Sequence, residues 1–212
     1  QIVGNGSSAR ATLTVLEGFL RGFGLFNIEL DVTTVSQPAL HLETDNSAAA
    51  PATNDALRFG LHNVSIRSSQ PTVGFLFEGA TLGLITQCTI VGPTIGIGFI
   101  GSVINEVNDL YFSDINFADC VTADLGTLVS ASGTGIGIVD MTNVWFERLK
   151  HWDRGGTPVT NYVNFSTGTM VNVHGFDCRW ARDVADDTLL VIPADVVFLG
   201  HSAAGVESII GA

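Results

Sequence analysis

Charged side chains are scarce in this chain of 212 residues. Only 14% of its positions are Asp, Glu, Lys or Arg, against roughly 25% in an average soluble domain. Nine basic residues stand against 21 acidic ones, which leaves a net charge of −12 at pH 7. Such an acidic chain is not attracted to nucleic acid or to anionic membranes, so neither is expected as a partner. A chain this poor in charge is expected to bury part of its outer surface against copies of itself or a larger assembly.

Signatures of membrane, redox and nucleotide chemistry are also missing. No run of about 18 apolar residues occurs, so no membrane span is predicted. The three cysteines, Cys88, Cys120 and Cys178, form no CxxC pair, and Cys88 and Cys178 are expected to be buried thiols. The run Gly96 to Gly101 has the spacing of a dinucleotide-binding loop, but a strand-like run follows where the pyrophosphate would need a helix. The sequence therefore predicts no cofactor and no metal site.

The chain does contain one six-residue sequence motif, which occurs six times. The copies are Leu25–Leu30, Leu61–Ile66, Ile85–Ile90, Phe112–Phe117, Met141–Phe146 and Val173–Cys178. In each copy the first, fourth and sixth positions are apolar or Cys, and the third is Asn, Gln, Asp or, once, Gly. The third positions are 27, 63, 87, 114, 143 and 175, at intervals of 36, 24, 27, 29 and 32 residues. An irregular period of this size indicates a solenoid, propeller or array, and the alternation of apolar and polar residues indicates β-strands.

A coil with one repeat per turn would satisfy the polar third positions. Strands of successive turns would pair in parallel about 4.8 Å apart, and the third side chains would stack in a column. Stacked amides can hydrogen-bond along such a column, which offsets the cost of burying them. We therefore expect a buried, hydrogen-bonded ladder. Its predicted members are Asn27, Asn63, Gln87, Asp114 and Asn143.

The setting "apolar-x-Asn-apolar-x-apolar" resembles the asparagine ladder of right-handed parallel β-helix proteins, the pectate-lyase-like superfamily and the phage tailspikes. This resemblance implies an all-β, single-stranded right-handed parallel β-helix of about seven coils. Residues 1–11 are expected to be a lead-in or linker and residues 12–200 the β-helix. Residues 201–212 are expected to be a C-terminal cap or docking tail.

The candidates for catalysis are carboxylates. Glu43 and Glu78 lie 16 and 15 residues after their ladder positions, so they are expected to point outward from adjacent coils near His41. Two neighbouring carboxylates suit a glycosidase; two solvated acids at strand ends are the alternative. Asp153 is the third candidate. No Walker, HExxH or nucleophile-elbow motif occurs, which excludes the hydrolases built on them.

A second set of residues is predicted to bind a ligand. Six of the nine basic residues follow ladder strands, where equivalent loops of successive coils must stack. Cations would bind the carboxylates of an acidic sugar, while an aromatic ring would stack on the sugar ring. A solvated loop with one anchoring Trp is the alternative. The predicted ligand-binding residues are Arg148, Lys150, His151, Trp152, Arg154, Arg179 and Arg182.

The resemblance implies a virion-surface, extracellular module similar to a segment of a phage tailspike or tail fibre. Its expected role is structural, with binding of a host surface polysaccharide. Its expected partners are other virion proteins and copies of itself in a homotrimer, with outward apolar residues such as Trp145 and Leu76 at the contacts. The competing hypothesis is a pectate-lyase-like glycan hydrolase or lyase. The calcium-binding Asp cluster that the resemblance implies for pectate lyases is not recognisable in the sequence.

Overall fold

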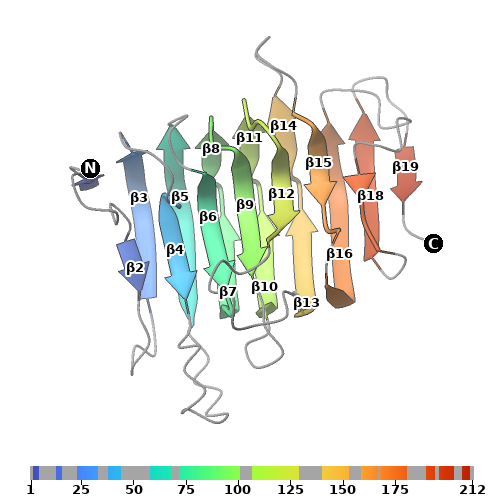
Figure 1. Ribbon diagram of the computed structural model, residues 1–212, viewed down its shortest axis with the longest axis horizontal. Helices are drawn as coiled ribbons and strands as arrows, with labels where there is room; N and C mark the ends of the chain where they lie inside the picture. Colours follow the sequence, from blue (N-terminus) through green and yellow to red (C-terminus); the bar gives the residue numbers. More distant parts are fainter. Residues whose placement is uncertain are drawn as a thin grey trace.

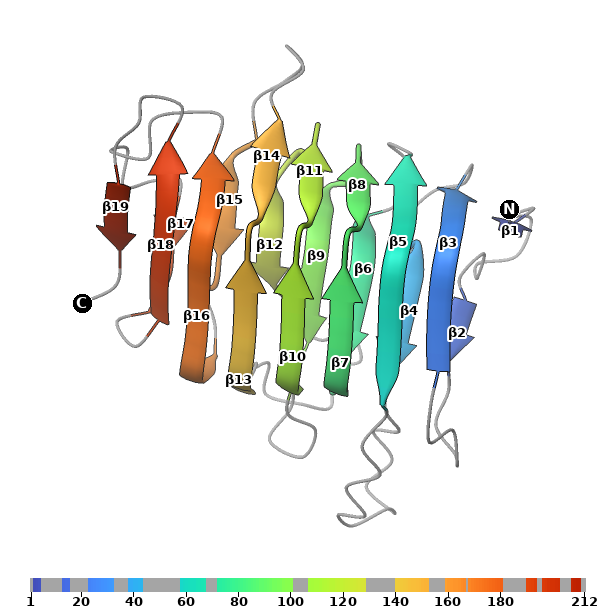
Figure 2. The same cartoon turned by 180° about the vertical axis from the view of Figure 1, so that it is seen from behind.

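The computed structural model describes most of the repeat region of the chain (Figures 1 and 2). The described residues are 2–4, 13–15, 23–32, 38–43, 58–67, 72–100, 107–128, 140–152, 159–166, 168–180, 190–193, 196–202 and 207–210. These residues form strands, turns and bends, with no helix among them. The expectation of an all-β protein is confirmed.

The strands form two layers, which we call sheet A and sheet B. Sheet A has 12 strands: β1 (Ile2–Gly4), β3 (Phe23–Val32), β5 (Phe59–Arg67), β7 (Thr81–Thr86), β8 (Thr89–Val91), β10 (Val107–Ser113), β11 (Asn116–Ala118), β13 (Asp140–Glu147), β14 (Lys150–Trp152), β16 (Thr169–Trp180), β18 (Val196–Ser202) and β19 (Glu207–Ile210). Sheet B has seven: β2 (Leu13–Val15), β4 (Leu40–Glu43), β6 (Val73–Glu78), β9 (Ile95–Ile100), β12 (Ala123–Thr127), β15 (Asn161–Asn164) and β17 (Leu190–Val191).

The chain alternates between the two sheets, and every strand except β19 pairs in parallel with strands of its own sheet. In sheet B the order is β2, β4, β6, β9, β12, β15 and β17, which is also the order in the sequence. In Figure 2 the corresponding strands of sheet A stand side by side in front of sheet B. The one antiparallel pair in the described sheets is β18 with β19, at the C-terminal end. Two facing parallel sheets with this order are consistent with a β-solenoid.

Both ends of the chain contribute strands to sheet A. The stretch 1–11, expected to be a lead-in, contains β1, which pairs with β3. The stretch 201–212 contains β19, which covers the edge of β18. An added strand at the edge of a sheet satisfies backbone groups that would otherwise be open to pairing with other chains.

Residues with left-handed backbone conformation bend the strands of sheet A. Gln87 separates β7 from β8, Asp114 separates β10 from β11, and Arg148 separates β13 from β14, with φ between 52° and 55°. Asn27 and Asn63 adopt the same conformation inside the unbroken strands β3 and β5. Asn and Asp tolerate this conformation better than other non-glycine residues, which explains their recurrence at the bend.

The strand register aligns these bends in one row, which we call the bend row. Its members are Asn27, Asn63, Gln87, Asp114, Arg148 and Asp177, all with positive φ. The Nδ2 of Asn63 donates to the Oδ1 of Asn27 at 2.8 Å. The expectation that the ladder is buried is wrong for Asn27, Asn63 and Gln87, which are exposed. The bend points these side chains outward, so they can bond to one another and to water.

The expectation that Asn143 stacks on Asp114 is also wrong. β13 pairs with β10 so that Met141 faces Val107 and Phe146 faces Phe112, which sets Asn143 beside Asp109. Asn143 Nδ2 donates to Asp109 Oδ1 at 3.1 Å. The reason is that the six-residue pattern occurs twice in this coil, once from Val107 and again from Phe112. The sequence alignment used the later copy, from Phe112, in one coil and the copy from Met141, which pairs with the earlier one, in the next coil.

Asn143 thus belongs to a second row of left-handed residues, five positions before the bend row. This row contains Leu82, Asp109, Asn143 and Asn172, with φ between 53° and 56°. Asn172 Nδ2 donates to Asn143 Oδ1 at 2.7 Å, so the amide of Asn143 bonds on both sides. The predicted third position Gly175 is not a ladder residue, because it faces Phe146 inside the core.

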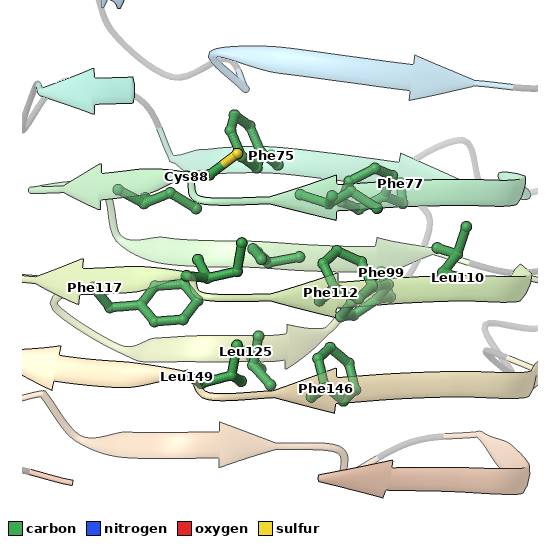
Figure 3. Close-up of a cluster of buried hydrophobic side chains, with 14 of the residues drawn as sticks. Phe75, Phe77, Cys88, Phe99, Leu110, Phe112, Phe117, Leu125, Phe146 and Leu149 are labelled. Carbon is green, nitrogen blue, oxygen red and sulfur yellow. The ribbon is translucent and has the colours of Figure 1, made fainter. Parts of the chain in front are cut away.

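Phenylalanine rings fill the space between the sheets (Figure 3). In sheet A the rings of Phe112 and Phe146 stack 5.0 Å apart, and Phe146 stacks on Phe198 at 5.7 Å. In sheet B, Phe77 stacks on Phe99 at 5.9 Å. These side chains are buried, so each contributes about 1.5–3 kcal/mol relative to exposure.

The cysteines are free and lie in the core. The expectation for Cys88 and Cys178 is confirmed, since both are buried. Burial raises the pKa of the Cys88 thiol to about 11 and that of Cys178 to about 12. Cys120 is likewise buried with a raised pKa. These thiols therefore stay protonated and unreactive at neutral pH.

Replacing Gly175 by Ala should destabilise the protein by about 1–3 kcal/mol. The ring of Phe198 occupies the place of a Cβ at Gly175, so the methyl group would push Phe198 off Phe146. Gly60→Ala is the matched control, because a Cβ there would meet only open space and a backbone oxygen 3.9 Å away. Urea unfolding of both variants checks this; equal midpoints would contradict the stacking account.

Replacing Asn143 by Leu should destabilise the protein by about 2–3 kcal/mol. Leu cannot form the two amide bonds and is disfavoured in left-handed conformation by about 1–2 kcal/mol. Asn143→Gly loses the bonds but not the backbone preference, so it should cost about 1 kcal/mol. Unfolding midpoints in which Gly is as damaging as Leu would show that backbone conformation contributes nothing here.

Candidate ligand-binding face of sheet A

The strands that follow the bend carry an outward surface at the carboxyl end of sheet A. Two register rows form it, and we call them together the carboxyl-end face. The first row is Glu29, Ser65, Thr89, Asn116, Lys150 and Arg179; the second is Arg67, Val91, Ala118 and Trp152. The side chains between these rows, Ile66, Ile90 and Phe117, are buried, as expected for alternation along a strand.

Trp152 is the dominant apolar side chain of this face. It is 59% exposed on β14, and its register neighbours on β11 and β8 are the small residues Ala118 and Val91. Ala118 is only 5% exposed, whereas the indole of Trp152 is itself accessible. An exposed indole can stack on a flat, partly apolar ligand such as a sugar ring.

Two cations lie next to Trp152. Lys150 is level with Arg179 on the adjacent strand β16. Arg179 is 63% exposed, and its Nε is 3.8 Å from Asp177 Oδ1, which is too long for a hydrogen bond. An exposed contact of this length contributes little, so the guanidinium remains able to bind another anion. Of the residues predicted to bind a ligand, the structure brings together Lys150, Trp152 and Arg179.

Arg148 is held in the bend row instead. Its Nε and Nη2 donate to the two carboxylate oxygens of Asp114 at 2.8 and 3.0 Å, and its Nη1 contacts Glu147. The Arg148 guanidinium lowers the pKa of Asp114, mainly through this hydrogen bond. Bidentate pairing fixes the side chain between two coils. We therefore assign Arg148 to alignment of the coils rather than to the ligand.

His151 points into the core, so its predicted place at the ligand face is wrong. Its side chain is only 5% exposed, and its Nδ1 lies 2.8 Å from Asp124 Oδ2. Its ring packs against Tyr162 with centroids 5.0 Å apart, and Tyr162 stacks on Trp180. The reason is strand alternation: Lys150 and Trp152 face outward on β14, so the residue between them faces inward.

Asp124 is the buried partner that the sequence analysis missed. Its carboxylate is fully buried, and Oδ1 has no hydrogen-bond partner of normal geometry within the described structure. Burial raises the pKa of Asp124, and the hydrogen bond from His151 opposes this shift without cancelling it. The available signal was a lone carboxylate in the apolar run Ala123 to Leu125. A buried acid in such a run requires an inward-facing partner.

The carboxylates proposed for catalysis are only partly placed. β4 and β6 pair so that Glu43 is level with Glu78, and Glu78 Oε2 lies 2.9 Å from His41 Nε2. Glu78 therefore has a partner within the protein. The side chain of Glu43 and the whole of Asp153 lie outside the described residues, as do Arg154 and Arg182. Their predicted roles stay predictions.

Stability should fall as the pH rises above the normal range of an Asp, because Asp124 has a raised pKa. A group whose pKa is higher in the folded than in the unfolded chain favours folding when protonated, and this contribution is lost as pH rises through the folded value. Asp124→Asn keeps an acceptor for His151 without the charge, so it should remove this loss. Unfolding midpoints of both proteins between pH 4 and 8 check this.

Asp124→Leu is the control, because it removes charge and acceptor together and leaves His151 buried without its partner. It should be less stable than Asp124→Asn throughout the pH range. A wild-type chain with the same pH profile as Asp124→Asn would show that Asp124 is not the group responsible.

No three His, Cys, Asp or Glu side chains gather closely enough to hold a metal ion in the described part of the chain. That part also contains no helix long and apolar enough to cross a membrane. Comparison of the chain with protein-family models, with curated proteins and with solved structures finds no match.

Proposed function

We propose that this chain is a structural β-solenoid module whose carboxyl-end face binds an acidic glycan. The observation that carries the proposal is the exposed indole of Trp152 beside Lys150 and Arg179 on neighbouring strands. All Lys and Arg residues in the described ranges belong to strands of sheet A or their ends. These cations share sheet A with Glu29, Asp109, Asp114, Glu147 and Asp177, and the row position that brings two cations together is that of Lys150 and Arg179.

The chemistry of the face matches an anionic sugar chain. Lys150, Arg179 and Arg67 supply donors to carboxylates, while Thr89 and Asn116 supply hydrogen bonds to hydroxyls. Register spacing of about 4.8 Å repeats these groups along the solenoid, so successive sugar units would meet successive strands. An extended polymer lying across β8, β11, β14 and β16 fits this repetition better than a compact small molecule does.

We also propose the finer architecture: a right-handed parallel β-helix of about seven coils, with the bend row as its ladder. In Figure 1 the chain runs down through β6 in the near layer, up through β7 and β8 in the far layer, and on to β9. This path supports a right-handed coil, the hand of nearly all parallel crossovers. The alternation of Asp114, Arg148 and Asp177 supports a ladder that uses charge as well as amides.

The location at a virion surface is part of this proposal and rests on the resemblance of the repeat pattern to that of the phage tailspikes. The trimer and the other virion proteins implied by the same resemblance stay predictions, as does the competing polysaccharide-degrading activity. Leu76, expected at a subunit contact, is only 6% exposed, so it has little free surface to offer a neighbour.

The proposal predicts that the protein binds a uronic-acid polysaccharide but not the neutral polymer dextran. Trp152→Ala and Arg179→Ala should each weaken binding by about tenfold or more, as expected when a contact of 1.4 kcal/mol or more is lost. Raising salt from about 0.05 to 0.5 M should weaken it further, because exposed ion pairs are screened. Titration calorimetry or glycan-array binding measures both effects.

Val191→Ala is the matched control, an exposed apolar side chain on sheet B. It should leave binding unchanged. Equal binding of acidic and neutral polymers, or full binding by Trp152→Ala, would contradict the proposal. Shortening of the polysaccharide during incubation would instead support the enzyme hypothesis.

A further inference from the structure

The half of sheet A that precedes the bend carries a different outward surface, which we call the amino-end face. It consists of two register rows across β3, β5, β7, β10, β13 and β16. The first row is Gly24, Gly60, Leu84, Tyr111, Trp145 and His174; the second is Phe26, His62, Thr86, Ser113, Glu147 and Phe176. The inward residues between the rows, from Leu25 to Phe146, are buried.

Side-chain size changes along the first row. It begins with two glycines and ends with two rings, Trp145 and His174. At Gly60 the surface is open, because a Cβ there would approach only a backbone oxygen at 3.9 Å. A shallow depression of about 470 Å³ lies beside it, lined on the outer side by Arg58, Leu82, Leu84, Asp109 and Tyr111. The face is therefore hollowed over β5, β7 and β10, while rings fill it over β13 and β16.

The amino-end face is also apolar for an outer surface. Phe26 is 60% exposed, Leu84 52%, Phe176 43% and Leu82 37%. Phe26 lies on β3, Leu82 and Leu84 on β7 and Phe176 on β16, and the half-buried rings of Tyr111 and Trp145 lie on the strands between β7 and β16. An outer face with several large apolar side chains is typical of an interaction site. Its charges are few: Arg58 and Asp109 both line the depression, and Glu147 contacts Arg148, which also pairs with Asp114.

We propose that two copies of this chain pack amino-end face against amino-end face about a two-fold axis that runs along the strands between β7 and β10, so that the solenoid axes are antiparallel and the facing strands run in the same direction. A two-fold interface uses the same patch on both copies, so the patch must be complementary to itself after a rotation of 180°. Rotation about this axis sets β5 against β13 and β3 against β16. These are the strands on which the small and the large residues of the rows lie.

The rows of the two copies are complementary in side-chain size after this rotation. The open surface over Gly60 meets Trp145 of the second copy, and Leu84 meets Tyr111. At the ends of the face, the ring of Phe26 lies over Gly24 in its own chain, where it occupies the place of a Cβ. It would meet the second copy's pair of His174 and Phe176, whose ring centroids are 6.0 Å apart. The most exposed apolar rings of the face are thereby buried together.

The charges are complementary as well. Arg58 is the cation at the edge of the depression, and among the described residues no ion-pair partner is found for it. The two-fold rotation brings Arg58 over Asn143 of the second copy, one strand away from that copy's Asp109. Asp109 accepts a hydrogen bond from Asn143, which holds its carboxylate at the surface. Each dimer would contain this cation and carboxylate contact twice.

The area of the amino-end face indicates a small interface. Six strands at about 4.8 Å and some five residues at about 3.3 Å give roughly 480 Å² of flat sheet per copy. The two copies together would therefore bury a surface area of about 1,000 Å², which is near the lower limit of specific interfaces. The dimer should therefore be weak and its population should depend on concentration.

Cysteine pairing tests the geometry directly. Gly60→Cys and Trp145→Cys are prepared as separate single variants, mixed at about 100 μM and oxidised with a mild disulfide catalyst. Because Gly60 and Trp145 meet only across the interface, the mixture should give a disulfide-linked dimer, and neither variant alone should give as much. The native cysteines are buried and should not contribute. Circular dichroism confirms that both variants fold.

Ser65→Cys mixed with Trp145→Cys is the matched control, since Ser65 lies on the same strand as Gly60 but beyond the bend. Linkage as efficient in this control, or none in the test mixture, would overturn the proposal. Sedimentation equilibrium of the unmodified protein gives a readout without these substitutions. A monomer–dimer equilibrium abolished by Leu84→Asp is expected; a monomer at 200 μM, or a trimer, would contradict the two-fold arrangement.

Discussion

The parallel register of sheet A is the constraint on which the rest of this structure depends. Once coils stack in register, every residue of one coil has an equivalent residue about 4.8 Å away in the next. Along the bend row a left-handed residue in one coil is matched by left-handed residues in its neighbours. Amides and charges at this bend bond to one another between coils, as Asn63 does to Asn27 and Arg148 to Asp114. Phenylalanine stacks in the core follow from the same register.

The alternation of apolar and polar residues was sufficient to predict an all-β protein with parallel strands. It was not sufficient to align the coils, because the pattern repeats at an offset of five residues inside one coil. Asn143 and Asp114 fit the same pattern but lie in different rows. Only the pairing of Phe112 with Phe146 decides between the two alignments, and that contact is long-range. Arg148 was missed as a bend residue because Arg is unusual in left-handed conformation.

The sequence predicted the candidate site correctly for side chains whose direction follows from strand alternation. It did not predict side chains whose position depends on a partner elsewhere in the chain. Lys150 and Trp152 lie two residues apart on one strand and share the outer face, whereas His151 between them turns inward to Asp124. The sequence shows a cluster of cations and rings, but the role of each depends on which side of the sheet it occupies. The two outer faces of sheet A differ for the same reason: the bend row divides a polar, cationic surface from an apolar one.

A crystal structure of the protein with a bound uronic-acid oligosaccharide would test the central claim most directly. We predict sugar density across β8, β11, β14 and β16, with one ring against Trp152 and a carboxylate between Lys150 and Arg179. The same map would show Asn143 beside Asp109. Density between Glu43 and Glu78 with an empty carboxyl-end face, or Asn143 paired with Asp114, would contradict the account.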